Sequence, residues 1–186
     1  MAVKRATEIP TIDVNLVTVQ AEGETDEWIL DTASQIQVEP QIETEDGVKL
    51  VVKGVLKAQK PEVSTLTGHQ ITLTDNVFTP ELVKILQGGT ITRGQDNVVT
   101  GYRPPVAGSS EKGSVFTLNA YSAQYNAAGL ITRYEKISYP NCQGVPVAFN
   151  SEDGVFRTPQ YTINSSPDIG EAPYEMTYVN TLPTAS

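Results

Sequence analysis

Several residue types are scarce in this chain of 186 residues, and each scarcity excludes particular kinds of structure or activity. A single cysteine, Cys142, excludes an internal disulfide bridge, and no zinc-type spacing of cysteines and histidines occurs. A single histidine, His69, leaves little material for general acid-base chemistry. We therefore expect a protein that folds without a metal ion or a disulfide bridge.

Basic residues and long apolar runs are also scarce. The chain holds 13 Lys and Arg against 22 Asp and Glu, which gives a formal net charge of −9. Because DNA affinity comes largely from Lys and Arg that neutralise phosphates, this balance argues against a nucleic-acid binder. No apolar run approaches the roughly 20 residues of a membrane span. The N-terminus lacks the apolar stretch of a secretory signal, so we expect no membrane partner.

β-Branched residues are abundant instead, with 20 Val, 12 Ile and 21 Thr. These side chains lose rotamer freedom in a helix but pack well on a pleated sheet. The 14 Gly and 12 Pro mark frequent turns. The composition predicts a mainly β protein. We expect an extended N-terminal arm at residues 1–11, one strand-rich domain at 12–180 and a polar C-terminal tail at 181–186.

Turn residues divide the first half of the chain into expected strands. Asp46–Gly47 predicts a hairpin turn, because both residues tolerate positive φ, and a long strand is expected to follow it from Val48 to Leu56. A second hairpin turn is expected at Thr67–His69. In the second half, short strands are expected at 145–149 and 155–157, among others.

One short helix is expected at about residues 79–87. Thr79 suits the N-cap, Pro80 suits the first helical position, and Glu81 suits the positive end of the helix dipole. An apolar stripe of helical spacing follows and Gly88 ends it. The stripe consists of Leu82, Val83, Ile85 and Leu86. A helix of this length is expected to cover a sheet edge or one end of the sandwich.

A loop rich in Pro, Gly and Ser is expected at residues 101–113. Loops of this length inside a compact domain are usually functional or ordered by a partner. Seven of the eight tyrosines lie beyond residue 120. Tyrosine combines apolar area with a hydroxyl that tolerates water, and it is favoured at protein–protein contacts. Together these features favour an assembly subunit.

The residues capable of chemistry form no recognisable catalytic pattern. His69 is expected to be exposed in its turn, and Cys142 is expected to be a small buried apolar residue. The segment Gly108–Ser114 lacks the lysine of a phosphate-binding loop. The acidic group at residues 22–27 lacks the ligand spacing of a calcium loop. We expect no catalytic, cofactor-binding or metal-binding residue, no cofactor and no enzymatic activity.

Five segments carry a resemblance to a known family: LDTA at 30–33, LTDNVF at 73–78, YNAAGLI at 125–131, YEKISYPNC at 134–142 and PYEMTYV at 173–179. Together they resemble the tail tube proteins of tailed bacteriophages, especially those of phages and prophages of Gram-positive bacteria, and of related phage-tail-like particles. The likeness extends over most of residues 28–180. It rests on strand segments rather than on a short signature motif.

The resemblance implies a β-sandwich or barrel-like fold with a flanking helix, in subunits that form hexameric rings. The rings stack into a tube, and DNA passes through its lumen at ejection. It implies a location in the virion tail after synthesis in the host cytoplasm. Implied partners are further copies of the chain, and tail sheath, tape measure, baseplate and tail terminator proteins.

The resemblance also implies roles for particular residues. Long loops and arms of such subunits reach the neighbouring ring, which places inter-subunit contacts in the arm at 1–11 and in the loop at 101–113. The loop candidates are Tyr102, Arg103, Pro104, Pro105, Ser109, Glu111 and Lys112. An acidic lumen would repel DNA and keep it from sticking in transit. The lumen candidates are Glu39, Glu43 and Glu45.

Two alternatives stay open at the level of the sequence. The tyrosines also suit a monomeric β-sandwich that binds a carbohydrate or acts as an adhesin, although a single tryptophan, Trp28, is little for a glycan site. An enzyme would need Cys142 paired with His69, or a pair of carboxylates. Rings or tubes in electron micrographs would favour the tube subunit over both alternatives.

Overall fold

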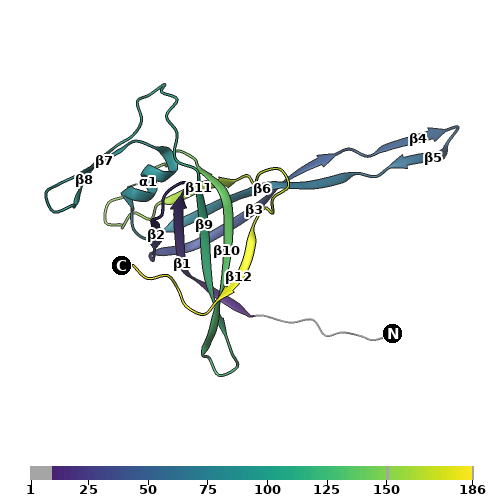
Figure 1. Cartoon of the computed structure of the whole chain (residues 1–186). Coiled ribbons are helices and arrows are strands. Elements are labelled where there is room, and N and C mark those ends of the chain that lie inside the picture. Colours follow the sequence, from purple (N-terminus) through teal and green to yellow (C-terminus); the bar gives the residue numbers. More distant parts are fainter. Residues whose placement is uncertain (1–9, 150, 186) are drawn as a thin grey trace.

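The computed structural model describes residues 10–149 and 151–185, and its architecture is mainly β (Figure 1). Twelve strands and one short helix occur within these residues. The elements are β1 (Thr11–Ala21), β2 (Glu27–Leu30), β3 (Ala33–Glu45), β4 (Val48–Val52), β5 (Val55–Lys60), β6 (Val63–Asp75), α1 (Pro80–Gln87), β7 (Thr90–Arg93), β8 (Val99–Arg103), β9 (Phe116–Tyr125), β10 (Ile131–Gly144), β11 (Gln160–Ser165) and β12 (Glu175–Val179).

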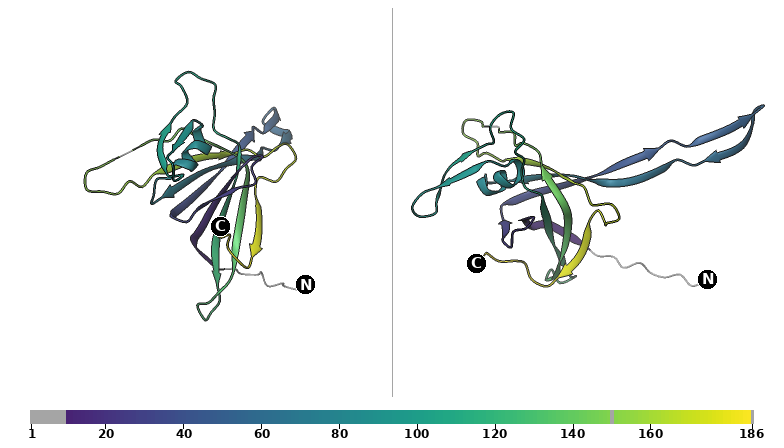
Figure 2. Two further views of the ribbon diagram at one scale, coloured as in Figure 1. Left: turned by 60° about the vertical axis from the view of Figure 1, so that its left-hand side comes forward. Right: turned by 45° about the horizontal axis from the view of Figure 1, so that its top comes forward.

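Eight strands form one antiparallel sheet, which divides into two layers at β10. The order is β2-β1-β9-β10-β11-β6-β3, and β12 also pairs with β10. Strand β10 pairs with β12 up to Ser138 and with β11 from Cys142 onward. Between these partners its register against β9 shifts, and Asn141 takes a φ of 48°. The strand bends there, so β2, β1, β9 and β12 leave on one side and β11, β6 and β3 on the other (Figure 2).

The hydrophobic core lies between the two layers. Val17 and Val19 of β1 and Leu118 of β9 contribute from one layer, whereas Ile71 of β6 and Ile163 of β11 contribute from the other. All five side chains are fully buried. Alternating residues of each strand therefore face the core, as expected of a β-sandwich-like fold. The predicted fold class, mainly β with one short helix, is confirmed.

Helix α1 begins and ends where its sequence predicts. Thr79 is the N-cap, Pro80 opens the helix and Gly88 ends it with a φ of 81°. The apolar stripe is buried against the core cluster: Leu82, Val83, Ile85 and Leu86. Two glycines allow the close approach of the helix, since a Cβ atom on Gly144 would lie 2.5 Å from Leu86 Cα and one on Gly113 would lie 2.3 Å from Leu86 O.

The hairpin expected at Asp46–Gly47 is wrong, because the chain continues in the same direction through that dipeptide. Strand β3 pairs with β6 as far as Glu45 opposite Val63, and β4 then pairs with β5 from Val48 opposite Lys60. The turn lies at Lys53–Gly54, where both residues take positive φ, 51° and 79°. Such a two-residue turn matches the right-handed twist of the strands that flank it. The expected single strand from Val48 to Leu56 is therefore two strands.

The β4–β5 ribbon projects far from the body of the molecule, and we call residues 46–62 the arm (Figures 1 and 2). In the view of Figure 1 the arm extends to the right, whereas α1, β2 and the β7–β8 ribbon lie at the left of the body. The arm extends far because the β4–β5 ladder continues the β3–β6 ladder in the same direction.

The turn expected at Thr67–His69 is also wrong. Strand β6 runs through these residues from Val63 to Asp75. Gly68 is needed in the strand because a Cβ atom there would lie 2.3 Å from Ser165 O of β11. His69 consequently faces the core with only 6% of its surface exposed, and it is not an exposed turn residue.

Other expected boundaries shift by a few residues. Strand β1 begins at Thr11. Residues 1–9 of the N-terminal segment expected at 1–11 lie outside the described residues. Residues 101–103 belong to β8, so the long loop begins at Pro104. The expected strands at 145–149 and 155–157 do not form, and their described residues belong to a loop before β11.

Candidate functional site

A polar face covers the layer formed by β3, β6 and β11. Its three rows run across the three strands: Gln35, Thr74 and Gln160; Gln37, Thr72 and Thr162; Glu39, Gln70 and Asn164. Within the last row Gln70 Nε2 donates to Asn164 Oδ1 at 3.5 Å. The three strands contain no Lys or Arg. A face of amides, hydroxyls and carboxylates without Lys or Arg offers phosphate groups no positive charge to neutralise them.

The lumen candidates lie on this polar face. Glu39, Glu43 and Glu45 have the same parity along β3, and all three are exposed. Glu39 accepts a hydrogen bond of 2.9 Å from Gln37 Nε2. Glu45 forms an ion pair of 2.9 Å with Lys60 at the base of the arm. Glu43 lies opposite Thr65. The three carboxylates that the sequence analysis proposed for the lumen therefore lie on one face of the sheet. That this face lines a lumen stays a prediction.

The arm exposes large aliphatic side chains on both of its faces. Six of them are at least 44% exposed: Val48, Leu50, Val51, Val52, Val55 and Leu56. Exposed clusters of this kind mark interaction sites in folded proteins. The expected single long strand from Val48 to Leu56 covers these residues. Their true position depends on the Lys53–Gly54 turn, and that dipeptide was the signal that could have revealed it.

The arm is also the most basic part of the chain. Residues 48–60 hold Lys49, Lys53, Lys57 and Lys60 and no Asp or Glu, although the whole chain has a net charge of −9. Lys60 pairs with Glu45. The other three lysines make no ion pair with a described residue. The outer part of the arm, residues 48–60, therefore combines apolar surface with three unpaired positive charges. The two carboxylates of the arm, Asp46 and Glu62, lie at its base.

Some of the loop candidates make side-chain hydrogen bonds within the chain, whereas others are exposed. The Tyr102 hydroxyl donates to Gly88 O and accepts from Gln87 Nε2, both at 2.8 Å, so Tyr102 holds the end of α1. Glu111 Oε1 accepts from Gly89 N at 3.1 Å. Pro105 is half-buried. Arg103, Pro104, Ser109 and Lys112 are exposed.

A polar ladder fixes β2 against the sheet. Thr18 of β1 donates to Glu27 Oε1 of β2, and Asn119 Nδ2 of β9 donates to the same oxygen at 2.9 Å. Ser138 Oγ of β10 continues the ladder by donating to Asn119 Oδ1 at 2.7 Å. The Glu27 carboxylate is thus used inside the chain. The other carboxylates of the acidic turn between β1 and β2 are exposed and unpaired among the described residues: Glu22, Glu24 and Asp26.

His69 and Cys142 lie in the interior without forming a pair. Ser165 of β11 separates them, since it pairs with His69 on one side and with Cys142 on the other. His69 makes edge contacts with Tyr139 and Tyr174, at centroid distances of 5.5 and 5.6 Å. Burial lowers the pKa of His69, and burial raises the pKa of the Cys142 thiol to about 12. The expectation that Cys142 is a buried residue is confirmed.

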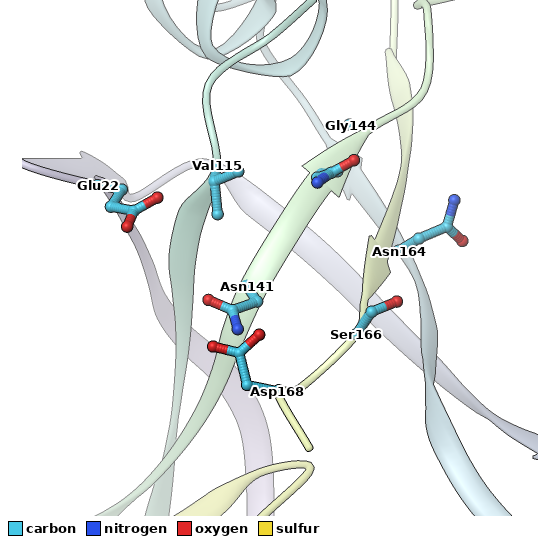
Figure 3. A pocket seen from close by; sticks show the side chains of 8 residues that line it. Glu22, Val115, Asn141, Gly144, Asn164, Ser166 and Asp168 are labelled. Atoms are coloured by element: carbon cyan, nitrogen blue, oxygen red, sulfur yellow. The ribbon is translucent and has the colours of Figure 1, made fainter. Parts of the chain in front are cut away.

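A cavity of about 410 Å³ lies where β10 meets β11 (Figure 3). The side chains of Asn141 and Asp168 point toward each other in it, and Glu22 lies at its far side. Among the residues that the structure describes, no group of three or more His, Cys, Asp and Glu side chains is arranged to hold a metal ion. None of the described helices has the length and apolar character needed to cross a membrane.

Comparisons with known proteins give a weak structural likeness. No family model and no curated protein matches the chain. A chain in the cryo-EM structure of the anti-feeding prophage baseplate is similar over 96% of this chain and 98% of its own length, with 10% identity and a TM-score of 0.36. A TM-score of 0.36 is too low to transfer a function from that chain to this one. The function has to be inferred from this chain's own surfaces.

Proposed function

We propose that this chain is a self-assembling structural subunit, the tube subunit of a phage tail or phage-tail-like particle. The observation that carries the proposal is the arm. Six aliphatic side chains on this projecting two-stranded ribbon are 44–64% exposed to water. Burial of the remaining surface would stabilise each by roughly 1 kcal/mol, about half the value for a fully exposed side chain. In a self-assembling particle, a second copy of the chain is the partner that buries this surface.

The polar face of β3, β6 and β11 supports the second half of the proposal. Once copies join into a ring, this face suits the wall of a channel for DNA. Its carboxylates repel phosphate, and its amides and threonines hold no cation to which DNA would adhere. Free edges of β3 and β2 end the sheet and are available for pairing between neighbouring copies. Six copies in each ring follow from the resemblance of the sequence to tail tube proteins.

Electron microscopy and sedimentation of purified protein test the proposal. We expect rings or tubes from the wild-type chain at high concentration. The variant V51S/L56S removes two cross-strand partners near the arm tip and should raise the concentration needed for assembly at least about tenfold. The control V155S changes a valine that is 62% exposed on a different loop and should assemble normally.

Circular dichroism should show the same fold in all three proteins, because the substituted residues are exposed. A wild-type chain that remains monomeric at every concentration, with and without nucleating tail tips, would overturn the proposal. Glycan binding by that monomer would favour a ligand-binding β-sandwich instead.

A further inference from the structure

The arm has a matching cavity at the opposite end of the molecule. This cavity of about 210 Å³ lies between β2, α1 and β7. Trp28, Ile85 and Ile91 form its apolar wall. Figures 1 and 2 show these three elements on the far side of the body from the arm. Its volume suits the side chains of one or two aliphatic residues, such as those at the arm tip.

The charges around the cavity complement those of the arm. Glu24 lines the cavity and belongs to the acidic turn, whose Glu22, Glu24 and Asp26 carboxylates are unpaired among the described residues. The outer part of the arm carries the unpaired Lys49, Lys53 and Lys57, whereas the arm's carboxylates, Asp46 and Glu62, lie at its base, away from the tip.

Two basic residues also line the cavity. Arg93 is neutralised by an ion pair of 2.7 Å with Glu81, which leaves Lys84 as the unpaired cation. The three unpaired carboxylates of the acidic turn therefore outnumber the one unpaired cation that lines the cavity.

From this match we infer that the arm tip of one copy docks into the cavity between β2, α1 and β7 of the next copy, with the arm lysines against the acidic turn. This inference rests on the proposed self-assembly and names the surface that receives the arm. Because donor and acceptor lie at opposite ends of one chain, the contact is head-to-tail and propagates from copy to copy. Charge pairs at its rim make assembly sensitive to salt.

A charge-reversal experiment tests the contact with full-length chains. Variant K53E/K57E gives the arm negative charges, and variant E22K/E24K gives the acidic turn positive charges. Each variant alone brings like charges together and should assemble at least about tenfold less readily than the wild type. An equimolar mixture should assemble again, because each arm then finds a turn of opposite charge on the other variant. The control E152K/D153K reverses exposed carboxylates elsewhere and should behave as the wild type.

Trp28 provides a direct readout, because it is the only tryptophan and is 37% exposed at the cavity. Its emission should shift to shorter wavelength on assembly of the wild type and of the mixture, and remain unshifted in either variant alone. Normal assembly of either variant alone, or a mixture that does not recover, would overturn the inference.

The outcome separates the contact from the proposed function. If tubes form regardless of the charges on the arm and the turn, this contact is refuted, whereas the proposal of a tube subunit still holds. Binding of the arm to DNA or to anionic phosphatidylserine vesicles, without recovery of assembly in the mixture, would also refute it. A wild-type chain that never assembles would instead refute the proposed function.

Discussion

At the scale of single residues, burial decides what the two rare side chains do. His69 lies among aromatic rings, with an Nδ1 atom that has no hydrogen-bond partner among the described residues. Cys142 is fully buried, and its Sγ donates to Tyr139 O at 3.3 Å. The sequence alone could anticipate the burial of Cys142 from the habits of free cysteines. It could not anticipate that of His69, because its neighbours include Ser165 of β11 and Tyr174, which come from the end of the chain.

The lowered pKa of His69 predicts a loss of stability in mild acid. The unfolded chain binds a proton at about pH 6.5, whereas the folded chain resists it, so protonation favours the unfolded state as pH falls. We expect the wild-type Tm to decrease between about pH 7 and about pH 5. The variant His69→Phe keeps an aromatic ring and should lose less stability over that range. Calorimetry at each pH measures this, and equal slopes for both proteins would contradict it.

The raised pKa of Cys142, about 12, predicts an unreactive thiol in the folded protein. Thiolate is the reactive form, and burial removes both thiolate and access. We expect no modification by a maleimide at neutral pH in native buffer, and complete modification in denaturant. Mass spectrometry distinguishes the two states, and rapid labelling of the native protein would contradict the described burial.

At the scale of elements, local sequence predicted the helix but misplaced the hairpins. The α1 boundaries depend on Thr79, Pro80 and Gly88, all of which act on adjacent residues. The arm depends instead on pairing between β3 and β6, whose first partners, Ala33 and Asp75, are far apart in sequence. Asp46–Gly47 has strong turn propensity, yet the long ladder continues past it. Register between distant strands cannot be read from the turn residues alone.

The candidate site was predictable to a similar extent. Strand alternation places Glu39, Glu43 and Glu45 on one face, so that grouping needed only the sequence. The receiving cavity combines Trp28, Ile85 and Ile91 from three separate elements. No local pattern links those three residues, because only the tertiary fold brings them together.

The close approach of α1 to β10 predicts a severe effect of a single methyl group. A Cβ atom at Gly144 would lie within 2.6 Å of three atoms of Leu86, so Gly144→Ala should push the helix outward and destabilise the fold by about 2 kcal/mol. The control Gly101→Ala has no atom within 4 Å of its new Cβ and should be nearly neutral. Chemical denaturation compares the two, and equal stabilities would contradict the described packing.

At the scale of the whole molecule, the proposed assembly places opposite charges at opposite ends and a polar face along one layer. The arm is basic, the β1–β2 turn is acidic, and β3, β6 and β11 hold no Lys or Arg. A chain with this polarity has distinct donor and acceptor ends. Such a subunit adds to a growing structure in one orientation only.

The lumen assignment predicts that reversed charges make the channel retain DNA. The variant E39K/E43K changes two exposed side chains, so the fold and assembly should persist. We expect assembled variant tubes to protect a short DNA duplex from nuclease, because the new lysines attract phosphates inside the channel. Wild-type tubes should leave the duplex unprotected. Digestion of the duplex at equal rates with both tubes would place these carboxylates outside the lumen.

The joint at the base of the arm has a mechanical consequence. The β3–β6 ladder ends at Glu45 and Val63, the β4–β5 ladder begins at Val48 and Lys60, and residues 46, 47, 61 and 62 belong to neither. Pro61 has no amide hydrogen to bridge this gap. An arm that is bound to a neighbouring copy and flexible at its base would form an elastic connection between the two copies. The bending stiffness of the assembled filament would then depend on these four residues.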